Sequence, residues 1–213
     1  MSEKVIMPRE DWVKALDTVR EKIGYSTQIK SGDLASAIDI AFDDMVASII
    51  RGSVEVITGN RVTNIRPYAF YSCSALVSAN LLYVYSLPEH CFDGCANLTS
   101  VTTQYTPGVG AYAFNNCTSL QFLKLIATYV IREGTFNGCS SLNTLVIDYR
   151  GTEPPALDNI NAFDGTPFAV GGSGGTLYLR ENQVEACKVA PNWVDLVNAG
   201  TLTILPIEGS EYE

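Results

Sequence analysis

Residues 113–120 of the chain read AFNNCTSL, and the same arrangement returns at a fixed spacing. It occurs as AFYSCSAL from Ala69, as CFDGCANL from Cys91 and as TFNGCSSL from Thr135. The pattern forms three columns with a period of 22 residues: Phe70, Phe92, Phe114 and Phe136; Cys73, Cys95, Cys117 and Cys139; and Leu76, Leu98, Leu120 and Leu142. Three columns that share one period predict an internal structural repeat.

Each repeat is expected to contain one short strand. Counted from the leucine, positions +3 and +5 are mostly apolar and alternate with more polar neighbours, as in a half-buried strand. These positions are Ala79, Leu81, Val101, Thr103, Leu123, Leu125, Leu145 and Ile147. A unit of 22 residues cannot bury its apolar side alone, so stacked units must bury it against each other. The sequence therefore predicts a solenoid with a parallel sheet along one face.

The repeat array extends beyond its four clear members. A further AF pair at Ala162–Phe163 begins a degenerate final repeat, with Thr166 at the position of the cysteine. Upstream, Val54 and Ile57 are in phase with Leu76 and Ala79, which indicates a partial first repeat.

The cysteine column is expected to lie inside the solenoid as reduced thiols, because cysteine is small and among the most buried residue types. Its side chains would point the same way in successive coils, which is poor geometry for a disulfide. The paired C-x₂-C spacing of a zinc site is absent. We predict no metal and no cofactor.

The pattern I…AFxxCxxL…L at this length resembles the BspA-type leucine-rich repeat family over roughly residues 60–168. The resemblance implies a curved right-handed solenoid, in a family of cell-surface and interaction proteins whose repeats bind rather than catalyse. The expected fold class is α+β: a leucine-rich-repeat solenoid of 22-residue repeats with an N-terminal helical cap and a small C-terminal cap of strands and helices.

Three segments are predicted along the chain. Residues 1–50 form the helical cap, because Trp12, Leu16, Val19 and Ile23 step at helical spacing. Residues 51–168 form the solenoid, and residues 169–213 form the C-terminal cap. The acidic end, IEGSEYE, is expected to be frayed.

Catalytic motifs are weak in this chain. The stretch GGSGG at 171–175 matches a nucleophile elbow around Ser173, but a strand pattern follows it and the only histidine, His90, precedes it. The stretch GVGAYA at 108–113 matches a dinucleotide fingerprint only because it contains repeat columns. His90 and the adjacent Cys91 also occupy repeat columns, so we predict that the protein is not an enzyme.

The candidate binding site is the outer face of the sheet, where positions +2, +4 and +6 point away from the core. Its candidate residues are Asn80, Leu82, Thr102, Gln104, Phe122, Lys124, Ile126, Val146 and Asp148. Apolar members on a solvated face often mark a contact surface. The alternative is that a cap segment or a neighbouring subunit covers them. Tyr83, Tyr105 and Tyr149, at position +7, are expected to turn inward.

The formal net charge of −9 argues against nucleic-acid binding, which needs a cationic surface. We find no signal peptide and no apolar run long enough to span a membrane. Membrane insertion is therefore not expected, and a virion-associated or cytoplasmic location is favoured over secretion.

The flanks carry a second resemblance. The stretches ALDTVREKIGYSTQIKSGDLASAI and LYLRENQVEACKVAPNWVDLV, with the final LPIEGSEYE, are similar to flanks of phage and prophage tail-region proteins. The predicted function is recognition of a protein or glycan on a bacterial or host surface, as a tail-associated component. The alternatives are a structural virion protein that oligomerises through residues 1–50, and a cell-surface adhesin.

Overall fold

The computed structural model describes residues 56–58, 65–82 and 84–213, so the helices predicted within residues 1–50 lie outside the described residues. Long strands alternate with two-residue strands along the repeats, and helices appear only near the C-terminus of the described part. The elements are β1 (Val56–Thr58), β2 (Ser78–Leu81), β3 (Ser86–Leu87), β4 (Ser100–Thr103), β5 (Gly108–Val109), β6 (Phe122–Ile126), β7 (Val130–Ile131), β8 (Thr144–Asp148), β9 (Ala156–Leu157), the 3₁₀ helix η1 (Ile160–Phe163), β10 (Gly175–Leu179), α4 (Glu181–Cys187), α5 (Trp193–Asn198) and β11 (Leu202–Pro206).

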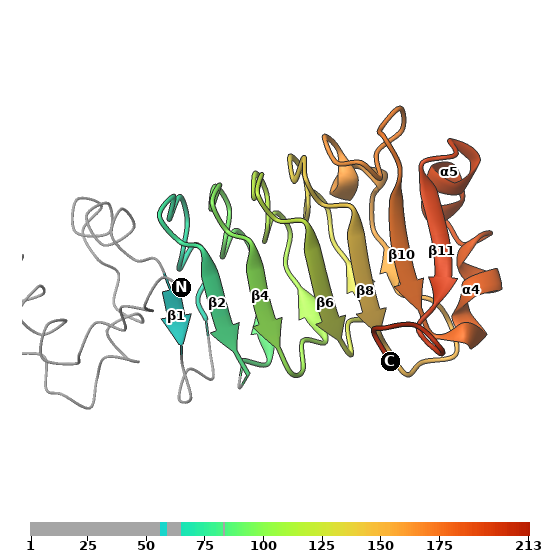
Figure 1. The fold of residues 1–213 in the computed structure, drawn as a ribbon, viewed down its shortest axis with the longest axis horizontal. Coiled ribbons are helices and arrows are strands. Elements are labelled where there is room, and N and C mark those ends of the chain that lie inside the picture. The colour runs from blue at the N-terminus through green and yellow to red at the C-terminus, as the bar shows by residue number, and fades with distance from the viewer. Residues whose placement is uncertain (1–55, 59–64, 83) are drawn as a thin grey trace, which may run out of the picture. The chain divides into compact units, whose positions relative to one another are not determined.

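The long strands lie side by side in chain order, all parallel (Figure 1). They form two hydrogen-bonded sheets, β1-β2-β4 and β6-β8-β10-β11, which we call together the main sheet. The two-residue strands form a second parallel sheet, β3-β5-β7-β9. Ser78 pairs with Ser100 and Phe122 with Thr144, so one coil of the chain corresponds to one sequence period. The predicted leucine-rich-repeat solenoid is confirmed.

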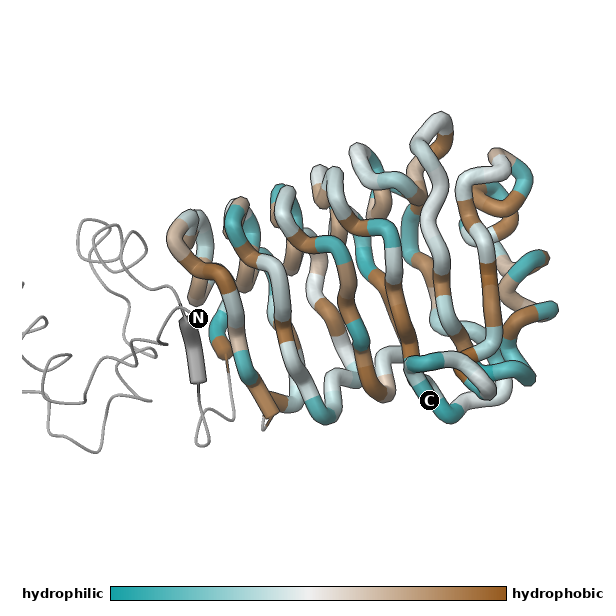
Figure 2. Tube along the Cα trace, viewed as in Figure 1, coloured by the Kyte–Doolittle hydropathy of each residue, from teal (hydrophilic) through white to brown (hydrophobic). Residues whose placement is uncertain are grey.

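Side chains alternate along the main strands as the sequence predicts. The eight inward positions, from Ala79 to Ile147, are all buried. Figure 2 shows the same alternation in hydropathy, with apolar positions recurring from one coil to the next. The degenerate ends also take their predicted register, since Ile57 pairs with Ala79 in the first repeat.

The phenylalanine column is a continuous stack of buried rings through the solenoid. Ring centroids are 5.2 Å apart between Phe70 and Phe92, 5.5 Å between Phe92 and Phe114, and 5.8 Å between Phe114 and Phe136. The rings are nearly parallel, with interplanar angles of 14–16°. Phe163 of the degenerate repeat extends the stack at 5.5 Å. Phe92, Phe114 and Phe136 thus each pack between the rings of their two neighbouring coils.

The cysteine column connects successive coils by hydrogen bonds. The thiols of Cys95, Cys117 and Cys139 donate to the carbonyl of the phenylalanine in the preceding coil, at 3.0, 3.2 and 2.9 Å. All six cysteines of the chain are buried, and none forms a disulfide. The prediction of buried, reduced thiols is confirmed. In the degenerate repeat, Thr166 instead donates to Phe163 of its own coil, at 2.6 Å.

Two positions in each coil have a left-handed backbone. The second of them, two residues after the phenylalanine, holds Ser72, Gly94, Asn116, Gly138 and Gly165. The first, two residues before the phenylalanine, holds Tyr68, His90, Tyr112 and Gly134. Aromatic residues seldom adopt this backbone, but here their rings stack: His90 lies 4.6 Å from Tyr68 and 5.0 Å from Tyr112. Stacking between coils offsets the local strain.

The C-terminal segment continues the main sheet with β10 and β11. Arg180 follows β10 and contacts Asp148 of β8 through Nε at 2.8 Å and Nη2 at 2.6 Å. Gln183 of α4 donates from Nε2 to three carbonyls of the segment 149–153. Trp193 of α5 is buried and donates to the Pro155 carbonyl at 2.7 Å. These polar contacts attach the C-terminal helices to the last repeats.

Candidate binding surface

The outer face of the main sheet falls into an open part and a covered part. On β2, β4 and the residues directly after them, Asn80, Leu82, Thr102 and Gln104 are exposed, and Ser100 lies beside them. We call these five residues the open face. None carries a charge, so the open face presents neutral hydrogen-bonding groups together with one leucine.

The part of the outer face on β6, β8 and β10 is covered by the chain's own C-terminal segment. Val146, at the middle of β8, is fully buried, so the prediction that it is exposed is wrong. Its register partners on the neighbouring strands are Lys124 and Tyr178, and both contact Tyr212. Figure 1 shows the C-terminal segment crossing in front of β10 toward β8.

Tyr212 holds this cover in place. Its ring stacks on Phe122 at 5.3 Å and meets Tyr178 edge-on at 4.8 Å. Its carbonyl accepts a hydrogen bond from the Lys124 ammonium at 2.6 Å. Loss of solvent contact, together with the neighbouring Glu211, raises the pKa of the Tyr212 phenol. Phe122 and Lys124 therefore bind part of the chain itself in this structure.

The expectation that the acidic end is frayed is also wrong. Ile207 is buried, and its N–H donates to the Leu179 carbonyl at 2.8 Å. The Glu208 carboxylate accepts a hydrogen bond from the Glu181 N–H at 2.8 Å and lies 3.4 Å from Arg180. Backbone N–H groups, including its own and that of Glu181, keep the Glu208 pKa below its ordinary value. Composition suggested a solvated tail, but a buried isoleucine anchors it.

Asp148 has a structural partner as well. It lies at the end of β8, and its carboxylate is engaged by Arg180. Ile126, on β6, is half-buried. Of the nine predicted surface residues, the first four belong to the open face. Phe122, Lys124 and Val146 lie under or beside the C-terminal segment, and Asp148 pairs with Arg180.

The contacts that hold residues 209–213 on the sheet are comparable with the cost of ordering them. Two ring contacts contribute about 0.5–1.5 kcal/mol each, and a hydrogen bond to a charged group about 1.5–3 kcal/mol. Burial of part of one large side chain adds roughly 1.5–2 kcal/mol. Fixing the backbone of five residues costs about 5–10 kcal/mol. The two sides agree to within a few kcal/mol, so the cover is only marginally held.

A row of exposed tyrosines adjoins the open face. Tyr85, Tyr105 and Tyr129 are 60%, 49% and 51% exposed, and they lie in the turns between the long and the short strands. Rings of adjacent coils pair: Tyr85 with Tyr105 at 6.2 Å, and Tyr129 with the half-buried Tyr149 at 6.4 Å. We call Tyr85, Tyr105 and Tyr129 the tyrosine edge.

The prediction that Tyr105 turns inward is wrong, because β4 ends at Thr103 and strand alternation does not extend to position +7. Tyr149 is half-buried and packs against the core, while Tyr83 lies outside the described residues. Sequence reasoning missed Tyr85 and Tyr129. Both occupy position +9 of their repeats, two residues beyond the +7 column. Aligning the tyrosines of all repeats at that position would have found them.

The rejected catalytic residues lie in separate environments. Cys91 is buried in the core, and loss of solvation raises the pKa of its thiol far above the ordinary value. His90 instead stacks between Tyr68 and Tyr112, with Nδ1 2.7 Å from Asp93 Oδ2. Within the part of the chain that the structure describes, no three His, Cys, Asp or Glu side chains are grouped as metal ligands.

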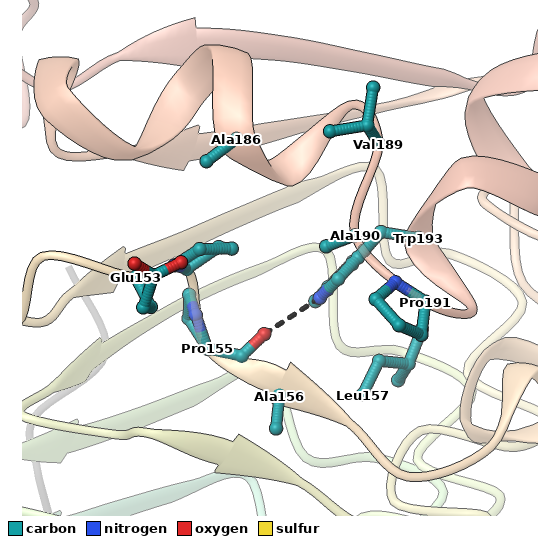
Figure 3. A pocket seen from close by; sticks show the side chains of 10 residues that line it. Glu153, Pro155, Ala156, Leu157, Ala186, Val189, Ala190, Pro191 and Trp193 are labelled. Carbon is teal, nitrogen blue, oxygen red and sulfur yellow. Dashed lines mark hydrogen bonds between the residues drawn. The ribbon is translucent and has the colours of Figure 1, made fainter.

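A half-open apolar groove of roughly 420 Å³ lies between residues 153–157 and the segment 186–193 (Figure 3). Prolines, alanines and Val189 line it, and the Trp193 indole donates to the Pro155 carbonyl inside it. Glu153 is its one ionisable lining residue. The groove offers apolar contact and no pair of groups for acid–base or nucleophilic catalysis.

Parallel coils with stacked phenylalanine and leucine columns define a leucine-rich-repeat protein. Residues 52–155 match the family model of the BspA-type leucine-rich repeat region, in six copies. The repeat region of this chain is therefore similar to the BspA-type leucine-rich repeat family. Members of this class generally serve as binding scaffolds for other proteins rather than as enzymes.

Among solved structures, the chain is similar to a leucine-rich repeat protein from Bacteroides ovatus, with 20% sequence identity and a TM-score of 0.47. The match covers 73% of this chain and 43% of that protein. None of the curated proteins compared with the chain matches it. Among residues 56–58, 65–82 and 84–213, no helix is long and apolar enough to cross a membrane.

Proposed function

We propose that this protein is a non-enzymatic recognition module that binds a partner protein through the open face and the tyrosine edge. The observation that carries the proposal is the adjacency of three exposed tyrosines and a neutral polar sheet face on a rigid repeat scaffold. The short strands hold these side chains at fixed spacing, so the surface is preorganised.

The composition of this surface supports recognition. Tyrosine provides a large contact area with few rotatable bonds, and serine and asparagine provide adaptable hydrogen bonds, which is the chemistry of antibody paratopes. Tyrosine is also enriched among the residues that dominate interface energies. The open face carries no charge, so long-range steering is small and association should depend little on salt.

A protein partner is favoured over a glycan because leucine-rich repeats generally mediate contacts between proteins. The setting that we propose is a phage or prophage tail, where the partner would be a bacterial surface protein. The support for this setting is the resemblance of the flanking sequences. Residues 1–50 would then attach the module to other tail components.

The test measures binding of the fluorescently labelled full chain to intact bacterial cells by flow cytometry. The variant carries Tyr85→Ser, Tyr105→Ser and Tyr129→Ser, and a control carries Val189→Ser, an exposed position that belongs to neither the tyrosine edge nor the open face. We expect the triple variant to lose at least tenfold in bound signal and the control to bind normally.

Pretreatment of the cells separates the partner classes. Protease treatment should abolish binding, and periodate oxidation of surface sugars should leave it unchanged. Binding that survives protease and is lost after periodate would identify a glycan ligand and overturn the protein assignment. The mass of the full chain by light scattering tests the setting, because an assembly component is expected to form a defined oligomer.

A further inference from the structure

We propose that residues 209–213 are a displaceable cover over a second, peptide-binding site on the outer face of the main sheet, formed by Phe122, Lys124, Val146 and Tyr178. This inference rests on the proposed function, because it gives the recognition module a second contact site and a means of controlling it. We call these four residues the platform.

The platform has the features of a binding site for one aromatic side chain. Phe122 and Tyr178 contact the Tyr212 ring from two directions, one stacked and one edge-on. Val146, between them on β8, is apolar and has no exposed surface while the cover is in place. Lys124 adds a cation that fixes the ligand backbone through a carbonyl. Aromatic walls, an apolar base and one directional polar group together specify an orientation.

The cover is separable from its anchor. Ile207 and Glu208 hold the segment to β10 and α4 by burial and by backbone hydrogen bonds. Beyond them, residues 209–213 form turns among themselves, as in the Glu213 N–H to Ser210 carbonyl bond of 3.4 Å. In the described part of the chain, Lys124 is the one sheet residue that hydrogen-bonds the cover. The cover can therefore leave the sheet without disturbing the strand ladder.

The cover, which occupies the platform in this structure, indicates the chemistry that a competing ligand needs. Tyr212 is flanked by Glu211 and Glu213, and its carbonyl faces the ammonium of Lys124. A competing ligand would present the same elements: a protein segment folded in a turn, with one aromatic side chain between acidic neighbours. The acidic flanks favour approach to the Lys124 cation over approach to an acidic part of the surface.

The test uses a peptide with the sequence IEGSEYE, labelled at its N-terminus, and fluorescence anisotropy. The proteins are the full chain and full-length Tyr212→Ala, in which the cover lacks its ring. We expect the peptide to bind Tyr212→Ala at least tenfold more tightly than the unmodified chain. Adding Phe122→Ala to Tyr212→Ala, or replacing the tyrosine of the peptide with alanine, should reverse the gain. Full-length Tyr105→Ala, whose change lies on the tyrosine edge, should behave like the unmodified chain.

Equal affinity of the peptide for the unmodified chain and for Tyr212→Ala would overturn the proposal, as would binding that Phe122→Ala leaves unchanged. Urea midpoints of all variants confirm folding. If Tyr212→Ala is unstable, Ser210→Ala provides a second way to loosen the cover, because it removes the Ser210 Oγ bonds to the Ile207 carbonyl and from the Tyr212 N–H. Cell binding through the tyrosine edge is measured separately. A negative peptide result with intact cell binding rejects only the cover, and a positive peptide result without cell binding rejects only the proposed function.

Discussion

Replacing Phe114 with alanine tests whether the phenylalanine column carries the stability of the solenoid. Phe114 has no exposed surface and packs between Phe92 and Phe136. Phe122 is the matched control, because it is 38% exposed. Within the described residues, its ring contacts one other aromatic ring, that of Tyr212 in the cover.

The expected losses differ several-fold. Truncating a buried phenylalanine to alanine costs about 3–5 kcal/mol, and two stacked ring contacts add about 0.5–1.5 kcal/mol each. We therefore expect Phe114→Ala to lower the free energy of unfolding by about 4–8 kcal/mol. At roughly 2–4 °C per kcal/mol for a domain of this size, the melting temperature falls by about 10–30 °C. Phe122→Ala loses one ring contact and should cost about 1 kcal/mol.

Urea unfolding of the full chain, followed by circular dichroism, measures both variants against the unmodified protein. A loss under about 2 kcal/mol for Phe114→Ala, or equal losses for the two variants, would refute the claim that stacking between coils dominates stability. A loss confined to Phe114→Ala with an unchanged urea dependence supports it, because the same surface is then exposed on unfolding.

Three further changes probe other contacts. Burial raises the pKa of Cys187 to about 12 and that of Cys91 further, so above the ordinary thiol pKa of about 8.5 the unfolded chain ionises first. The contribution of these thiols to the free energy of unfolding is complete below that pH. Above it, the free energy of unfolding falls by about 1.4 kcal/mol per pH unit for each such thiol. Urea unfolding at about pH 7.5 and 10.5 measures the difference. Gly134→Ala adds a Cβ against the Tyr112 ring at a left-handed backbone position and should cost about 2 kcal/mol in urea, whereas Gly108→Ala, with open space around it, should stay within about 0.5 kcal/mol. Gln183→Leu leaves three carbonyls of segment 149–153 without their donor, so we expect the free energy of unfolding to fall by about 2–3 kcal/mol in the same urea assay. An unchanged free energy of unfolding would show that water replaces the amide and would contradict this prediction.

The features that sequence predicted are those that repeat. The burial of Leu123 and Leu125, the reduced thiols and the register of Ile57 all follow from a period that samples each environment several times. A column supported by four copies averages out local variation. The fold and the direction of each strand side chain could therefore be predicted without a structure.

The features that sequence did not predict depend on a single contact between distant residues. Lys124 and Tyr212 are 88 positions apart, and nothing periodic connects them. Val146 looked exposed because its neighbours in the repeat are exposed, while its actual cover comes from the end of the chain. Tyr105 was misplaced for another reason: alternation indicates a direction only while the strand lasts, and the pattern does not mark its last residue.

Contacts between neighbouring coils make the repeat a unit of length as well as of structure. The rings of Phe92 and Phe114, the thiol of Cys117 and the strand register all recur after one period. Deleting one whole period of 22 residues from the β2–β4 region would bring equivalent phenylalanine, cysteine and leucine positions of the remaining coils next to each other. A shorter deletion would put all three kinds of position out of register at the junction. The segment from Phe122 to Tyr212 is different, because the cover must reach back across β10 and β8. The fold therefore allows the recognition surface to lengthen or shorten on one side while the platform and its cover keep a constant span.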